Sequence, residues 1–268
     1  MAQSFGLGLI IGTTFYNIPG SSKKAQVQDR NGGLFISSFS QVLLPIIGTL
    51  AIFSTETPVV MREISSGYYS PFGYYFSKIA IEIPFQILTT LISCSIIYFL
   101  SHFQRKVKKY LKFVGVIELG ALCGLSIGLS IATVAKDVTL ALQIAPFLLI
   151  PLILFSGLFI NNDSIPPYFT WIQYISPVKY MFQEVYKNEF YGLGIYEKNV
   201  EKMDFDKISS LLSIVILSTI TLVLYIFCYL MLFISIKKSL SKTKYISSKG
   251  ENNIIKLNGF NEPLLYND

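Results

Sequence analysis

Long apolar runs without charged residues dominate this chain. Of its 268 residues, 52% are hydrophobic and only 14% are charged, whereas a soluble domain carries about 25% charged residues. These few charges cannot solvate a surface of this size. A helix crosses the roughly 30 Å hydrocarbon layer with about 20 mostly apolar residues. We therefore interpret the chain as an all-α integral membrane protein.

Six stretches are predicted to be transmembrane helices. An even number of spans places both termini on the same side of the bilayer. The spans form one transmembrane domain, residues 1–236, which includes a long loop at 161–207 and is followed by a polar tail at 237–268. The tail lysines next to the membrane are interpreted as a solvated flank, with contact to anionic lipid as the alternative. The predicted spans are approximately residues 2–17, 31–55, 79–100, 113–135, 138–160 and 208–236.

The loop charges do not agree on an orientation. The loops at 17–32, 101–112 and 161–207 share one face and hold thirteen of the 22 Lys and Arg residues. By the positive-inside rule, this count favours the opposite face, with the tail, as the outside. Much of the imbalance comes from the short basic loop at 101–112.

The residue types that carry enzyme chemistry are scarce. His102 is the only histidine, the three cysteines lie inside apolar runs, and the sequence contains no GxxxxGK[ST] phosphate-binding loop. We therefore expect no catalytic residue, no metal and no cofactor in this chain. The net charge of +6 resides in short loops and the tail, so nucleic acid is not an expected partner. The cysteines are Cys94, Cys123 and Cys228.

Two acidic residues and a glycine repeat stand out within the predicted spans. A charged side chain is costly inside a membrane, so Glu82 and Glu118 need an explanation. Each either has a role in proton or substrate movement, or is held by a structural partner or at the membrane interface. Gly120, Gly124 and Gly128 form a tandem GxxxG, which predicts a tight helix–helix contact, within the chain or between protomers.

The second and fifth spans are interrupted by polar residues and prolines. Prolines bend helices and are tolerated in a membrane where neighbours or a cavity satisfy the freed backbone groups. The two helices therefore either line a central passage or simply pack together. The interrupting residues are Phe39, Ser40, Gln41 and Pro45 in the second span and Gln143, Pro146 and Pro151 in the fifth.

The two long connections differ in character. Residues 54–78 are predicted to form a polar, aromatic-rich loop. Within 161–207, Trp171, Ile175, Tyr180 and Phe182 recur at roughly helical spacing, which predicts short amphipathic helices lying at or dipping into the membrane interface.

Several short sequence strings follow one another in a fixed order along the chain. They are Asn31–Phe35 (NGGLF), Phe53–Glu63 (FSTETPVVMRE), Ser66–Ser70 (SGYYS), Glu82–Pro84 (EIP), Phe155–Asn161 (FSGLFIN), Ile165–Tyr168 (IPPY), Tyr174–Pro177 (YISP) and Asn188–Phe190 (NEF). In this order and spacing they closely resemble the membrane domain of the G (white/pigment/sterol) subfamily of ABC transporters. The resemblance runs from about residue 5 to 236.

The resemblance implies an ABC type-2 membrane domain that works as half of a dimeric transporter. Each half would pair with a second half, as a homo- or heterodimer, and with an ATP-binding domain that holds ATP and Mg. Met1 falls inside the first span, so we expect that domain either upstream in a longer chain or on a separate chain. The family topology places the tail in the cytosol and the 161–207 loop on the extracellular or lumenal side. The membrane would be the plasma membrane or an internal membrane. We adopt this orientation over the loop charges.

The resemblance also assigns roles to individual residues. Leu158 and Phe159 would form a hydrophobic outer gate. Asn162 fits a glycosylation sequon. The implied substrate-cavity residues are Phe39, Ser40 and Leu43, with Phe147 and Ile150 opposite, and the implied coupling helix that contacts the ATP-binding domain contains Glu56, Arg62 and Glu63.

The predicted function is ATP-driven export of lipids, sterols or amphipathic small molecules by alternating access. The chain itself is not an enzyme in this interpretation, and it becomes part of one when joined to an ATP-binding domain. Two alternatives stay open: an ATP-independent channel or carrier, and an inactive truncated half-transporter.

Overall fold

The computed structural model describes residues 2–16, 23–135, 137–160, 165–191 and 209–258. Within these ranges every regular element is a helix, in agreement with the predicted all-α class. The elements are α1 (Ala2–Thr14), α2 (Lys23–Ser65), α3 (Pro71–Leu100), α4 (Val107–Val134), α5 (Val138–Leu154), the 3₁₀ turn η2 (Pro167–Phe169), α6 (Thr170–Ile175), α7 (Pro177–Phe190) and α9 (Ser210–Asn258).

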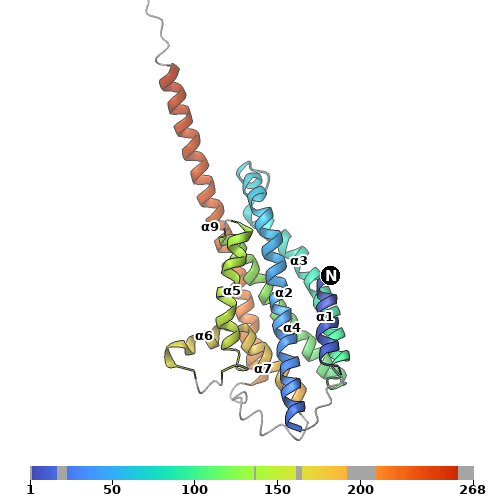
Figure 1. The fold of residues 1–268 in the computed structure, drawn as a ribbon. Coiled ribbons are helices and arrows are strands. Elements are labelled where there is room, and N and C mark those ends of the chain that lie inside the picture. The colour runs from blue at the N-terminus through green and yellow to red at the C-terminus, as the bar shows by residue number, and fades with distance from the viewer. Residues whose placement is uncertain (1, 17–22, 136, 161–164, 192–208, 259–268) are drawn as a thin grey trace, which may run out of the picture.

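The long helices lie side by side with their axes nearly parallel, and α9 continues far beyond the bundle (Figure 1). The turn between α2 and α3 lies at the end from which α9 projects, here called the α2–α3 end. The helix α7 and the start of α2 lie at the opposite end, called the α7 end (Figure 1).

Four of the described helices are long and apolar enough to cross a membrane. The helix α5 is apolar but has 17 residues, and α1 has 13. These two shorter helices fall within the fifth and first predicted spans. The membrane-length segments are Val27–Ser65, Pro71–Leu100, Val107–Val134 and Ser210–Lys238.

Residues 54–65 were predicted to belong to a loop, but they continue α2 as helix. The prolines Pro45 and Pro58 lie inside α2 without ending it. Near Pro58, the Thr55 hydroxyl donates to the Ile52 carbonyl and the Thr57 hydroxyl to the Phe53 carbonyl, both at 2.7 Å. The predicted coupling segment is therefore the end of α2 itself.

The turn that follows α2 is short. Gly67 adopts a φ of 82°, a left-handed conformation that glycine reaches without strain. Ser70 then caps α3, with its side-chain oxygen accepting a hydrogen bond from the Gly73 amide at 3.1 Å. Only residues 66–70 separate the two long helices.

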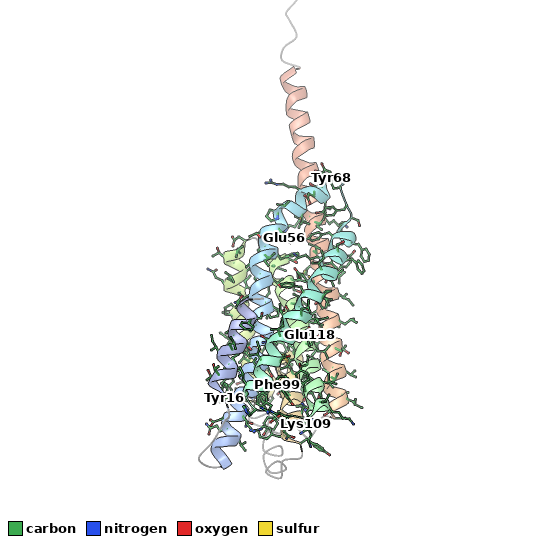
Figure 2. All side chains as sticks on the ribbon, turned by 90° about the vertical axis from the view of Figure 1, so that its right-hand side faces the viewer. Tyr16, Glu56, Tyr68, Phe99, Lys109 and Glu118 are labelled. Carbon is green, nitrogen blue, oxygen red and sulfur yellow. The ribbon has the colours of Figure 1, made fainter. Side chains whose placement is uncertain are left out.

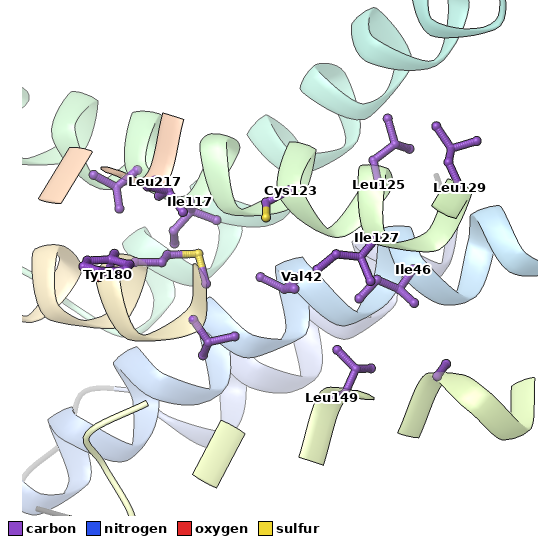
Figure 3. Packing of buried hydrophobic residues seen from close by; sticks show 14 of the residues in the cluster. Val42, Ile46, Ile117, Cys123, Leu125, Ile127, Leu129, Leu149, Tyr180 and Leu217 are labelled. Atoms are coloured by element: carbon purple, nitrogen blue, oxygen red, sulfur yellow. The ribbon is translucent and has the colours of Figure 1, made fainter. Parts of the chain in front are cut away.

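The helix α4 is the centre of the bundle. It packs against α2, α3, α7 and α9, and its buried residues run almost continuously from Phe113 to Thr133. Apolar side chains of α2 and α4 interleave where the two helices cross, with Val42 and Ile46 facing Ile127 (Figure 3).

The described part of the 161–207 loop divides into two different helices. The short α6 is exposed, with Trp171 61% and Tyr174 56% exposed. The helix α7 instead packs against α2, α4 and α9, and nearly all of its residues are buried. The helical spacing correctly predicted helices in this segment. The interfacial position predicted for them does not describe α7, which is buried by its contacts with α2, α4 and α9.

Candidate functional site

The candidate cavity residues on α2 lie on a partly exposed face. Phe39 and Leu43 are half-buried and pack at the edge of the core. The Phe39 ring stacks on Phe35 at a centroid distance of 6.2 Å. Ser40 is 9% exposed, and its hydroxyl donates to the Ser37 carbonyl at 3.0 Å. Two of these three side chains therefore reach a surface that the chain itself does not cover.

The helix α5 is anchored along one narrow seam. Its buried residues are Ala141, Ala145 and Leu149, while Phe147 is 86% and Ile150 55% exposed. Phe147 lines an apolar cavity of about 400 Å³ together with residues of α4, α6 and α9. The lining of this cavity includes no residue of α2, so Phe147 lines it without Phe39 or Leu43.

The predicted gate residues follow a sharp turn after α5. Gly157 has a φ of 92°, which allows the chain to reverse direction there. Phe159 is 59% exposed, and its ring stands edge-on to Phe35 at 5.4 Å. Leu158 is half-buried against the core. The gate segment is thus held against α2 near the α7 end.

The predicted coupling residues lie at the α2–α3 end, two of them in side-chain contacts. Lys78 Nζ lies 2.5 Å from a Glu56 oxygen and 3.1 Å from Glu82 Oε1. The Tyr69 hydroxyl donates to Glu63 at 2.5 Å. Arg62 is exposed, and among the described residues it forms no ion pair. The end of α2 is therefore tied to α3 and the turn, while the Arg62 side chain is available to a partner.

The Glu63 contact changes the acidity of Tyr69. Partial burial and the adjacent Glu63 carboxylate raise the pKa of Tyr69 to about 12. The phenol is therefore neutral at physiological pH and acts as a hydrogen-bond donor.

The two intramembrane acids have different surroundings. Glu82 is paired with Lys78, a partner that the i,i+4 spacing on α3 could have indicated. Glu118 lies midway along the bundle, between Glu56 and Lys109 (Figure 2). Neither of its carboxylate oxygens has a hydrogen-bond partner in the described part of the chain.

An ionic network at the α7 end was not predicted. Glu189 of α7 is 2% exposed, pairs with Arg30 of α2, and accepts a hydrogen bond from the Gln104 amide at 3.1 Å. Glu184, also on α7, lies 3.1 Å from Lys112 of α4. The sequence signal that could have indicated it is the charge of 177–190, which contains two Lys and two Glu residues. The structure buries nearly all of this segment.

The glycine repeat and the possible glycosylation site are the remaining predicted positions. Gly120, Gly124 and Gly128 are buried, and they face Met181 of α7 and Val42 and Ile46 of α2. This contact lies within the chain. Asn162 lies outside the described residues.

Comparison with known proteins identifies the family. The ABC-2 type transporter family matches residues 1–190. ABC transporter G family member 2 of Dictyostelium discoideum is 32% identical over 71% of this chain and 14% of its own length. ABC transporter G family member 7 of Arabidopsis thaliana is 27% identical over 74% of this chain and 27% of its own length.

Two further relatives belong to the same group. The broad substrate specificity ATP-binding cassette transporter ABCG2 of Bos taurus is 29% identical over 69% of this chain, and protein white of Drosophila melanogaster is 26% identical over 71%. The chain spans between 14% and 28% of the length of these relatives. The family match, the G-family relatives and the apolar helical bundle together show that this chain belongs to the ABC-2 type transporters, as an integral membrane domain of the G-subfamily type.

Proposed function

We propose that the chain is the membrane-spanning half of an ATP-driven exporter of lipids, sterols or amphipathic small molecules. The observation that carries this proposal is the family match over residues 1–190, combined with an α5 helix that buries only one seam. A helix with so much exposed apolar surface needs lipid, a second copy or a substrate beside it. Export of an apolar cargo along such a surface is the function that fits this domain.

The substrate would bind between two copies of the chain. Phe39 and Leu43 of α2 and the exposed Phe147 and Ile150 of α5 supply apolar contacts. Because these side chains are half-buried or exposed, a second half placed against them would complete the cavity. Leu158 and Phe159 would close its outer end, since the Phe159 ring contacts Phe35 of α2 and Leu158 packs against the core.

The ATP-binding domain would act on the α2–α3 end. The helix α2 joins Phe39 to Arg62 and continues through Pro45 and Pro58, so a push at one end would be transmitted along the same helix to the cavity wall. ATP and Mg would bind to the partner domain, and the differential affinity of ATP for the closed state would drive the change. The exposed Arg62 would contact that domain.

Mutation of the coupling end tests this proposal. In the assembled transporter, Arg62→Ala should abolish substrate stimulation of ATP hydrolysis while leaving thermal stability unchanged, because Arg62 makes no ion pair within the described chain. Glu63→Ala should also uncouple, and it should lower stability because Tyr69 loses its acceptor. Unchanged substrate-stimulated hydrolysis in both variants would refute the coupling role.

A further inference from the structure

A cavity of about 200 Å³, with polar side chains among a mostly apolar lining, lies between α1, α2 and α3 and reaches Leu125 of α4, on a different side of α2 from Phe39 and Leu43. This volume is several times the roughly 30 Å³ that one water molecule occupies in the liquid. The walls include Gln41, Gly48 and Thr49 of α2 and Glu82 of α3. The cavity is therefore large enough to hold a small polar group of several heavy atoms.

Two polar groups in the cavity wall have no partner among the described residues. Gln41 is 2% exposed, yet its side-chain nitrogen Nε2 has no hydrogen-bond acceptor. Glu82 uses Oε1 for Lys78, and its Oε2 is buried and unpaired. Buried polar atoms without a partner are costly, and in native proteins a water or a ligand usually satisfies them.

The charge near the cavity favours a cation. Among the described residues, Glu56 and Glu82 carry two formal negative charges and pair with the one positive charge of Lys78, an excess of one negative charge. The carboxylate oxygen that Lys78 does not contact is the one with no partner. An ammonium group would pair with that oxygen through a charge-assisted hydrogen bond.

The rim of the cavity is apolar and faces outward. Ile52 is 55% and Phe85 52% exposed, and both line the cavity from helices of membrane length. An alkyl chain in the bilayer can lie against this rim while a polar head reaches Gln41 and Glu82.

We propose that this cavity binds the amine head group of a membrane-borne cationic amphiphile, with the Glu82 carboxylate pairing with the ammonium and the Gln41 amide donating to a neighbouring hydroxyl or carbonyl oxygen of the ligand. The site is separate from the α2–α5 surface proposed for transported substrate. It can therefore be tested without any transport measurement.

Photolabelling measures occupancy directly. The full chain is reconstituted in phosphatidylcholine nanodiscs and labelled with dodecylamine that carries a diazirine in its tail, and labelled residues are identified by mass spectrometry. We expect labels on α2 and α3 around Ile52 and Phe85. Glu82→Gln should reduce this labelling about tenfold, because one charge-assisted hydrogen bond is lost. A dodecanol probe with the same diazirine should label these positions much less.

A second variant fills the cavity and leaves Glu82 unchanged, so it tests binding independently of the Glu82 charge. A Cβ atom at Gly48 would meet nothing within 4 Å, so the backbone there accepts a side chain, and Gly48→Leu should occupy the cavity and block labelling. Gly115 of α4 also has open space around it and does not line the cavity, so Gly115→Leu is the matched control and should label like the wild type.

Three results would overturn the proposal. One is equal labelling of the wild type, Glu82→Gln and Gly48→Leu, and another is equal labelling by the amine and the alcohol. The third is competition by short, water-soluble butylamine as effective as that by dodecylamine, which would show that the occupant does not come from the membrane. Because binding is measured, the absence of ATP-driven export would leave each result interpretable.

Discussion

A Cβ atom built on Gly124 of α4 would lie 2.4 Å from the carbonyl oxygen of Val42 on α2. Real Cβ atoms do not approach a backbone oxygen this closely, so the two helices can pack at this separation only because residue 124 is glycine. A Cβ atom built on the neighbouring Gly128 would lie 3.0 Å from both the Cα and the carbonyl oxygen of Ile46. The contact between α2 and α4 therefore depends on backbone approach.

Substitution of Gly124 should loosen this contact. We expect Gly124→Ala to lower the free energy of unfolding by about 1–3 kcal/mol, the usual cost of overpacking. Gly115→Ala should be neutral or slightly stabilising, because its Cβ meets nothing and alanine favours the helix. Thermal unfolding can be followed with a thiol-reactive dye, since the three cysteines are buried in the fold. Equal melting of the two variants would contradict the close contact.

Removal of Arg30 should leave the buried Glu189 carboxylate without its cation. We expect Arg30→Met to destabilise the chain by about 3–5 kcal/mol, because an unpaired buried charge is left behind. The double variant Arg30→Met with Glu189→Leu should be more stable than Arg30→Met alone, since it removes the orphaned carboxylate. A double-mutant cycle of melting measurements checks this order. A double variant less stable than the single one would show that Glu189 has other essential partners.

Glu189 should also make stability depend on pH. Burial raises the pKa of Glu189 above its ordinary value, although the Gln104 amide and Arg30 oppose the shift. The folded chain therefore holds this proton more tightly than the unfolded chain does. Its stabilising contribution is full below the unfolded pKa and is lost as the pH rises through the folded pKa. Melting curves across this range should show a weaker decline with rising pH in Glu189→Gln than in the wild type.

The hydrogen bond from Tyr69 to Glu63 should stabilise the α2–α3 turn. We expect Tyr69→Phe to cost about 1 kcal/mol, the typical net value of one hydrogen bond. Tyr68 is 79% exposed at the neighbouring position, so Tyr68→Phe is the matched control and should have no effect on melting. Hydrogen exchange at residues 63–70 should accelerate in Tyr69→Phe alone. Identical exchange in both variants would exclude a role for this bond in ordering the turn.

Much of the architecture could be predicted from composition and spacing. The scarcity of charge predicted a membrane protein, the apolar runs predicted where its helices lie, and the glycine repeat predicted a close helix contact. The loop predicted over 54–78 was wrong at residues 54–65, because Glu56, Arg62 and Glu63 are polar in sequence yet continue α2 beyond its apolar part. Polarity marks where a helix leaves lipid, which is a different point from where the helix ends.

The sequence by itself determined that this chain forms apolar helices of membrane length. A chain with so few charges lies in lipid, where hydrogen bonds within a helix satisfy the backbone N–H and C=O groups. Only the tertiary structure decided which faces meet. It buried α7 against α4, paired Lys78 with both Glu56 and Glu82, and placed the glycine repeat against α2 of the same chain. The physical reason is that lipid tails and apolar side chains are alike in polarity, so hydropathy cannot distinguish a helix face that contacts protein from one that contacts lipid.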